Sequence, residues 1–232
     1  MYANPFQPEI CLHLDLIMYT FCLHRNSEIE CEYVFSGGHS AWKYREALTK
    51  AKSSIPPNID LGCDRAYLGA HSNRKFAESM AVSRIDGPSK TQVCLRAGQS
   101  VGRTQDCYIS QEDDGDALVG RTVAQLKMTA DEFDVLPPHF TKETEKELEL
   151  YGWDNIYPGY SHHPPTFQRV IRSLFASLVY HYHTGYLAKR CDHDHPIWRT
   201  RTFVWRGLIN SLNGKALVGH GHCKETNMYA KG

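Results

Sequence analysis

The sequence predicts a mainly α-helical protein with a small β-element near the front of the chain, a mainly α (α+β) fold class. Apolar residues recur at spacings of three and four in several segments, which is the periodicity of one buried helix face. Prolines and glycines interrupt these segments often, so the helices are expected to be short. Apolar residues make up 41% of the 232 residues, which suffices for the core of one ordinary domain with a small appendage.

The first part of the chain carries most of the predicted elements. An apolar stripe with Pro8 near its start predicts the first helix, and the pair Pro56-Pro57 ends the second. Pro88 stands at the first position of a later helix, and Gly98 is the glycine typical of its end. Helices are therefore expected over 8–23, 41–52, 72–82, 88–98 and 101–109, with a short strand over 30–35.

The character of the sequence changes after Pro137-Pro138. An acidic run over 142–149 comes next, then an aromatic, histidine-rich loop through Pro165, and then an apolar helix over 167–187. We therefore expect one domain over residues 1–140 and a helical C-terminal extension of unknown role over residues 141–232.

Composition argues against several classes of function. Lys plus Arg and Asp plus Glu number 26 each, so the net charge is zero and no global positive field attracts nucleic acid. No apolar stretch approaches the roughly 20 residues of a membrane-spanning helix, so no membrane partner is expected. The first Lys or Arg is Arg25, which argues against a secretory signal. Eight scattered cysteines without a CxxC pair fit a reducing compartment.

Histidines and cysteines of the second half leave a zinc-binding module open as an alternative. The densest runs are His162-His163, His181-Tyr182-His183, Cys191-Asp192-His193-Asp194-His195 and His220-Gly221-His222-Cys223. None of them pairs two clusters at the ligand spacing that identifies a zinc site, so we expect no metal.

The most informative block runs from His71 to Tyr108. His71 and Arg74 form a His-x-x-Arg motif at the start of a predicted helix. Gln99 follows Arg74 by 25 residues, and Tyr108 follows Gln99 by nine. This register resembles the active-site half of the tyrosine recombinases, in which a second histidine or a tryptophan and then the nucleophilic tyrosine follow the His-x-x-Arg of box II.

Flanking motifs narrow the resemblance to the recombinases of Crypton-type mobile elements. These motifs lie at Tyr2 to Pro5 with Pro8 to Cys11, Leu68 to Lys75, Leu95 to Gly98, Gly115-Asp116 with Val119 to Thr122, and Leu136 to Phe140. The resemblance covers most of residues 1–140 and, more loosely, the chain as far as about residue 210. It implies the C-terminal part of the catalytic core of a DNA breaking-rejoining enzyme, followed by a helical tail.

The resemblance implies DNA recombination or integration without a metal, a nucleotide cofactor or a small-molecule substrate. Tyr108 would attack a phosphate of double-stranded DNA and hold the 3′ end as a phosphotyrosine, while Arg74 offers a fork of donors to phosphate oxygens. His71 would donate to phosphate or take the tyrosine proton. Gln99 stands where the family has histidine or tryptophan. Its amide donates a hydrogen bond without carrying charge, a change that costs roughly 100- to 1000-fold in rate.

Local charge supports DNA binding by the same block. From Arg65 to Tyr108 the chain has seven basic and three acidic residues. Lys75, Arg96 and Arg103 are the expected contacts to the DNA backbone. Recombinases of this family act as synaptic tetramers, so the resemblance also implies self-association on DNA. The DNA substrate implies residence in the nucleus, although no Lys/Arg-rich import run is visible.

Two parts of the family's site have no counterpart before His71. The family needs a box I arginine and a lysine on a β-hairpin well upstream, and only 70 residues precede His71. Arg25, the nearest arginine candidate, lies 46 residues before His71, which is too close. We therefore expect an N-terminally truncated recombinase with impaired activity. The alternative is a noncatalytic DNA-binding or protein-interaction remnant that keeps the fold and has lost the chemistry.

Overall fold

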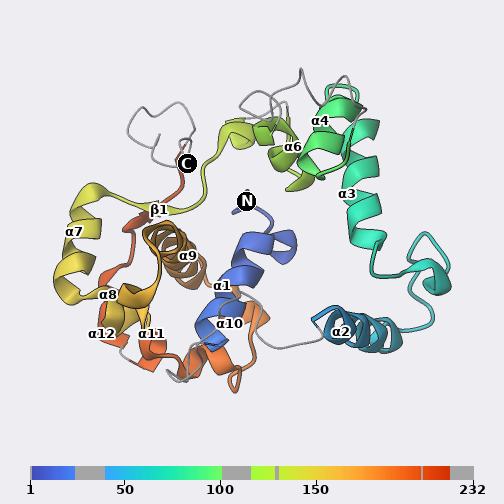
Figure 1. Ribbon diagram of the computed structural model, residues 1–232. Coiled ribbons are helices and arrows are strands. Elements are labelled where there is room, and N and C mark those ends of the chain that lie inside the picture. The colour runs from blue at the N-terminus through green and yellow to red at the C-terminus, as the bar shows by residue number, and fades with distance from the viewer. Residues whose placement is uncertain (1, 24–39, 101–115, 129–130, 205, 220–232) are drawn as a thin grey trace. The chain divides into compact units, whose positions relative to one another are not determined.

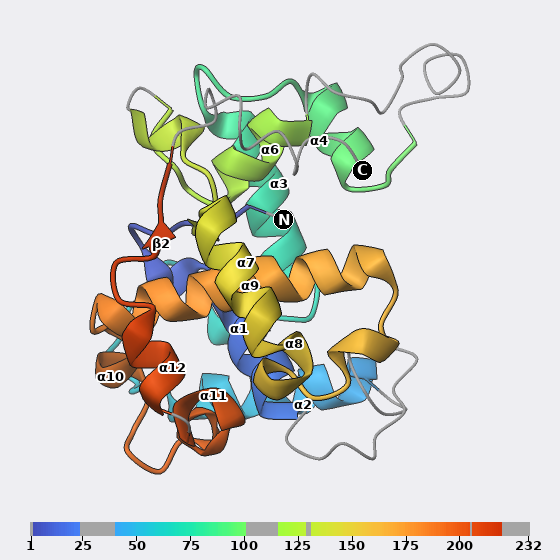
Figure 2. The same cartoon turned by 90° about the vertical axis from the view of Figure 1, so that its left-hand side faces the viewer.

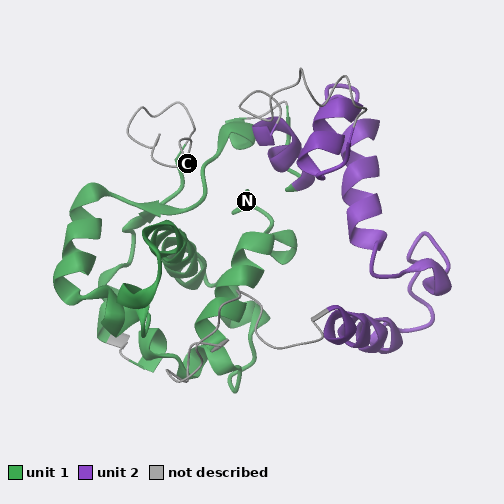
Figure 3. Ribbon diagram, viewed as in Figure 1, with its two compact units in different colours: residues 1–29, 124–232 green, residues 30–123 purple. Residues whose placement is uncertain are grey.

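The structure of the protein is a computed structural model that describes residues 2–23, 40–100, 116–128, 131–204 and 206–219 (Figure 1). These residues form many short helices and a pair of short strands, so the predicted mainly α-helical class is confirmed. The chain divides into two compact units, residues 1–29 with 124–232 (unit 1) and residues 30–123 (unit 2) (Figure 3). No helix within the described ranges is long and apolar enough to cross a membrane.

Unit 1 is built around helix α9 (Pro165–His183), along which helix α1 (Leu12–Leu23) packs. Figure 2 shows α9 from the side, with α7 crossing in front of it and α8 below it. The other elements of this unit are β1 (His139–Phe140), α7 (Lys142–Tyr151), α8 (Trp153–Ile156), α10 (Tyr186–Arg190), α11 (Arg201–Val204), α12 (Arg206–Ser211) and β2 (Ala216–Leu217). Short 3₁₀ helices lie at Pro8–Ile10, Asp131–Asp134, Tyr160–His162 and Pro196–Arg199.

Helices α1 and α9 bury their apolar faces against each other. Leu14 and Ile17 of α1 are completely buried, at the helical spacing that the sequence predicts. Phe175 of α9 joins an aromatic cluster, with its ring centroid 6.0 Å from that of Phe21 and 5.8 Å from that of Phe140. Complete burial of a side chain of this kind stabilises the fold by about 1.5 to 3 kcal/mol. These contacts therefore form the main core of unit 1.

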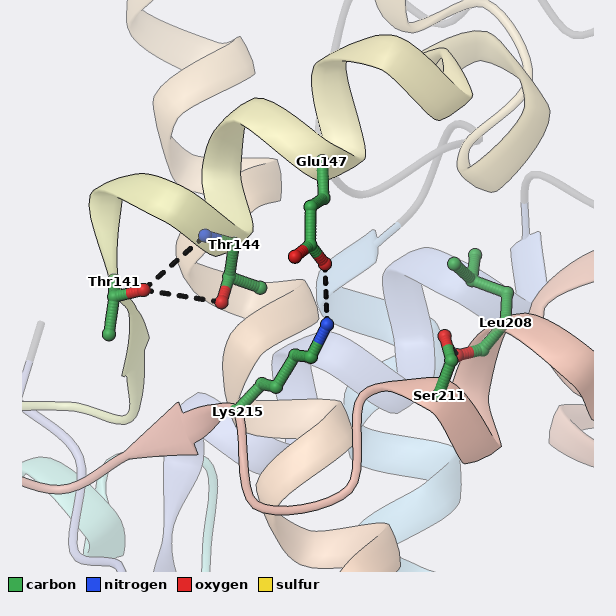
Figure 4. Close-up of polar contacts among 6 residues, drawn as sticks. All are labelled: Thr141, Thr144, Glu147, Leu208, Ser211 and Lys215. Atoms are coloured by element: carbon green, nitrogen blue, oxygen red, sulfur yellow. Dashed lines mark hydrogen bonds and ion pairs between the residues drawn. The ribbon is translucent and has the colours of Figure 1, made fainter.

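The acidic run forms helix α7, which Thr141 caps (Figure 4). The Thr141 hydroxyl accepts a hydrogen bond from the backbone N–H of Thr144 at 3.3 Å. One turn further on, Glu147 pairs with Lys215 in the turn before β2. Strand β1 pairs antiparallel with β2, with His139 opposite Leu217. The start of α7 is thus attached to the C-terminal part of unit 1.

The aromatic segment predicted as a loop contains α8 and a 3₁₀ helix, and Arg172 of α9 holds the two together. Its guanidinium lies 5.2 Å from the ring centroid of Trp153, and its Nε donates a 2.7 Å hydrogen bond to the Tyr160 hydroxyl. Its Nη1 also pairs with Glu149 of α7 at 2.9 Å. One cation therefore links three elements whose contact is not predictable from the sequence pattern.

The first and the last long helices are confirmed, with altered ends. The helix expected over 8–23 begins as a 3₁₀ helix at Pro8–Ile10 and becomes α1 at Leu12. The helix expected over 167–187 is divided, because α9 ends at His183 and α10 begins at Tyr186. Gly185 between them has a φ of +74°, the left-handed conformation that ends a helix.

Unit 2 has a small core shared by three helices. Its elements are α2 (Ser40–Ser54), a 3₁₀ helix at Arg65–Tyr67, α3 (Ser72–Ser83), α4 (Lys90–Arg96) and α6 (Asp116–Val123). Ala81 of α3, Val93 of α4 and Val119 of α6 are buried together. The strand predicted over 30–35 and the helix predicted over 101–109 lie outside the described residues.

Helix α4 begins at a capping box instead of at Pro88. The Ser89 hydroxyl accepts a hydrogen bond from the backbone N–H of Gln92, and the Gln92 side chain accepts one from the backbone N–H of Ser89. Pro88 therefore precedes the cap, whereas the sequence predicts it at the first helical position. The difference arises because a serine with glutamine three residues later is itself a complete helix start.

The compact units do not coincide with the division near residue 140 that the sequence predicts. Helix α1 precedes unit 2 in the chain, yet it packs on α9. Asn4 donates a 2.8 Å hydrogen bond to the carbonyl of Ala124, and Arg190 of α10 pairs with Asp15 of α1 at 2.8 Å. Periodicity in the sequence identifies the apolar face of α1, but it does not identify the distant helix that covers that face.

Candidate functional site

The predicted site residues that the structure describes lie in unit 2, where α3 begins and α4 ends. His71 immediately precedes α3, and Arg74 stands in its first turn. Because they are three residues apart, their side chains leave the same side of the helix. Both residues are exposed, and the His71 side chain makes no capping hydrogen bond. They are therefore accessible to a large ligand.

Arg74 and Gln99 meet at a carboxylate that sequence reasoning missed. The Nε of Arg74 donates to Oε1 of Glu78 at 2.8 Å, and the Nε2 of Gln99 donates to the same oxygen at 2.9 Å. The Nη2 of Arg74 donates to the carbonyl of Ala97 at 2.8 Å. The structure thus brings together two of the predicted catalytic residues, 25 positions apart. The only sequence signal for Glu78 was its place four residues after Arg74, a common helical ion-pair spacing.

The turn that ends α4 places Gln99 at this carboxylate. Gly98 has a φ of +66°, its N–H donates to the carbonyl of Leu95, and the N–H of Gln99 donates to the carbonyl of Cys94 at 2.8 Å. This pair of hydrogen bonds is the Schellman arrangement, which favours glycine at the left-handed position. The prediction that Gly98 ends this helix is therefore confirmed. The same turn places Gln99 where its amide reaches Glu78.

Replacing Gly98 with alanine is expected to destabilise unit 2 by about 1 kcal/mol, because a β-carbon disfavours the left-handed backbone. Nothing lies within 4 Å of a β-carbon built at this position, so the cost is conformational and not steric. Chemical unfolding followed by circular dichroism measures it. Gly69→Ala is the matched control, because Gly69 is equally open and has no positive φ. Equal stability of the two variants would contradict the prediction.

The residues predicted to contact DNA differ in their surroundings. Lys75, next to Arg74 on α3, is exposed. Arg96 is engaged within unit 2, because its Nη1 pairs with the carboxylate of Asp116 and donates to the Asp116 carbonyl at 3.1 Å. Arg96 therefore joins α4 to α6. Arg103 and the predicted nucleophile Tyr108 lie outside the described residues.

Helix α2 adds a basic surface that the charge count from Arg65 onward did not include. Asn73 donates a 2.8 Å hydrogen bond to the Tyr44 hydroxyl, and the Lys52 ammonium donates to the carbonyl of Leu68 at 2.9 Å. These bonds attach α2 to the segment that leads into α3. The charged residues of α2 are the basic Lys43, Arg45, Lys50 and Lys52 and the acidic Glu46.

Histidines considered for a zinc site have other partners where the structure describes them. The Nε2 of His183 donates to the carbonyl of Ile209 at 2.8 Å, and the Nδ1 of His195 accepts a hydrogen bond from the N–H of Ile197 at 3.2 Å. Across the described part of the chain, no group of three His, Cys, Asp or Glu residues could hold a metal ion. The run over 220–223 lies outside that part.

Comparisons with models of protein families, with curated proteins and with solved structures give no match to this chain.

Proposed function

We propose that this chain descends from a mobile-element tyrosine recombinase and that unit 2 carries a site for DNA strand transfer. The observation that supports this most is the meeting of Arg74 and Gln99 on one negatively charged oxygen. Two N–H donors directed at one anionic oxygen are what a phosphate oxygen requires of its binding groups. Tyr108, nine residues after Gln99 in the sequence, adds a nucleophile in the family's register.

The reaction is a pair of exchanges at one phosphorus atom. The phenolic oxygen of Tyr108 forms a bond to phosphorus as the bond to the 5′ oxygen breaks, and the leaving oxygen takes a proton to become a 5′ hydroxyl. A 5′ hydroxyl of another strand then attacks the phosphotyrosine and restores a phosphodiester. Arg74 and Gln99 stabilise the nonbridging oxygens, and His71 donates to phosphate or takes the tyrosine proton.

Double-stranded DNA is the proposed partner, which implies residence in the nucleus. Exposed Lys75 beside Arg74 supports contact with the backbone near the site, and the basic charges of α2 extend the surface. Binding through such contacts is expected to weaken steeply as salt rises. Self-association on DNA is part of the proposal, because two duplexes must be held together for strands to be exchanged.

The test is to trap the intermediate. The full chain is incubated with a suicide duplex, nicked so that the 5′ hydroxyl fragment diffuses away after cleavage, and covalent protein–DNA adducts are resolved under denaturing conditions. The proposed function expects an adduct attached to the DNA 3′ end. Absence of the adduct would overturn strand transfer, and absence of duplex binding as well would overturn any role on DNA.

A noncatalytic DNA-binding remnant is the second candidate, and two observations favour it. Glu78 occupies donors of Arg74 and Gln99, and Gln99 carries an amide that cannot transfer a proton. For this candidate the same experiment gives duplex binding without an adduct.

A further inference from the structure

The carboxylate of Glu78 lies where a ligand of Arg74 and Gln99 would bind. A single oxygen, Oε1, receives hydrogen bonds from both side chains. The side chain of Glu78 is 30% exposed and that of Arg74 is 51% exposed, so solvent and a large ligand reach this pair. A carboxylate is planar and a phosphate is tetrahedral, but both present anionic oxygens that accept hydrogen bonds. The two groups therefore compete for the same guanidinium and amide donors.

We propose that Glu78 is a built-in competitor for phosphate, which occupies the donors of Arg74 and Gln99 until DNA displaces it. The inference rests on the proposed function, because it takes the DNA phosphate as the ligand of this site. It goes further by assigning a role in controlling affinity to a residue outside the family's motif.

The contacts around Glu78 favour competition over a purely positioning role. Arg74 has a second anchor, since its Nη2 donates to the carbonyl of Ala97 independently of Glu78. Gln99 is held by the Schellman turn through its own backbone N–H. The Arg74 guanidinium and the Gln99 backbone therefore keep a partner when the carboxylate moves away, and the Gln99 amide stays attached beside Arg74. The negative charge itself then opposes an incoming phosphate.

The experiment measures binding of the full chain to a short mixed-sequence DNA duplex for Glu78→Gln and Glu78→Ala. Glu46→Gln is the matched control, because Glu46 also forms a helical ion pair in unit 2, with Lys50 at 3.1 Å instead of with Arg74. The proposal expects Glu78→Gln to raise affinity about three- to tenfold more than the control does, the effect of removing one nearby charge in a largely aqueous setting. The difference between the variants is expected to shrink as salt screens the charge.

The outcomes separate this proposal from the proposed function. Higher affinity in both Glu78 variants supports competition. Equal affinities of Glu78→Gln and Glu46→Gln, with the unchanged chain binding DNA, overturn the role of Glu78 and leave the proposed function intact. Lower affinity in Glu78→Ala with unchanged affinity in Glu78→Gln identifies a positioning residue and also overturns competition. Failure of every protein to bind the duplex, with unfolding curves that show folded chains, overturns both proposals.

Discussion

Replacement of Tyr108 with phenylalanine is expected to abolish the covalent protein–DNA adduct and to leave duplex binding unchanged. The substitution removes the oxygen that attacks phosphorus while it keeps the aromatic ring. The measurement is the suicide-duplex assay together with an equilibrium binding curve for each protein. An effect of this size, from an adduct to none, cannot come from a modest loss of stability.

The matched control is Tyr67→Phe, because Tyr67 lies in unit 2 and is 81% exposed. This variant is expected to form the adduct as the unchanged chain does. An adduct that persists in Tyr108→Phe would show that another residue is the nucleophile, and the nine-residue register from Gln99 would then lose its meaning.

Acidification is expected to destabilise unit 1 through two buried histidines, His13 of α1 and His181 of α9. Their exposed fractions are 6% and 1%, and burial lowers the pKa of each to about 4. The two rings are close enough that the charge of His13 lowers the pKa of His181 further. Within the described residues, neither ring nitrogen of His13 makes a hydrogen bond of normal geometry, although the Ser173 backbone partly raises its pKa.

The direction of the pH effect follows from these values. An unfolded histidine titrates near 6.5, so between about pH 6.5 and 4 the unfolded chain binds more protons than the folded chain. The free energy of unfolding therefore has its full value above the pKa of the unfolded histidine. It falls as the pH drops towards the pKa of the folded histidine. A shift of this size corresponds to roughly 3 kcal/mol for one histidine, a large share of the stability of an ordinary domain.

Urea unfolding followed by tryptophan fluorescence at several values between about pH 7 and 5 measures this loss, above the range in which most carboxylates titrate. His13→Leu is expected to flatten the pH dependence, because it removes one buried titrating group. His162→Gln is the control, since His162 is exposed, and it is expected to keep the full dependence. A stability of unit 1 that does not change across this range would contradict the prediction.

Local signals in the sequence predicted local structure well. The helix end at Gly98 and the apolar face of α1 each depend on neighbours within a few residues. Both can therefore be predicted without knowing the fold. The capping box of α4 is equally local. The sequence offers two possible starts for this helix, Pro88 and the capping box of Ser89 with Gln92, and the structure uses the capping box.

Long-range pairing could not be predicted from one sequence. The partner of α1 is a helix far along the chain, and periodicity does not encode which helix that is. The pairing of Arg96 with Asp116 and of Gln99 with Glu78 had the same limit, because each joins residues about 20 positions apart that resemble ordinary solvated side chains in the sequence. His13 lies at helical spacing within an apolar stripe, which favours burial of its ring, but nothing in the sequence shows that the ring lies close to His181.

In the sequence, unit 2 is inserted between α1 and the rest of unit 1, and this order affects how the protein folds during synthesis. Helix α1 leaves the ribosome early, but Ile171 follows Leu14 by 157 residues. At translation rates of about 5 to 20 residues per second, roughly 8 to 30 seconds pass before α9 exists to cover it. The core of unit 2 joins residues much nearer in sequence and is complete first. The nascent chain therefore carries an uncovered apolar helix through most of its elongation, which is when we expect chaperone binding to prevent aggregation.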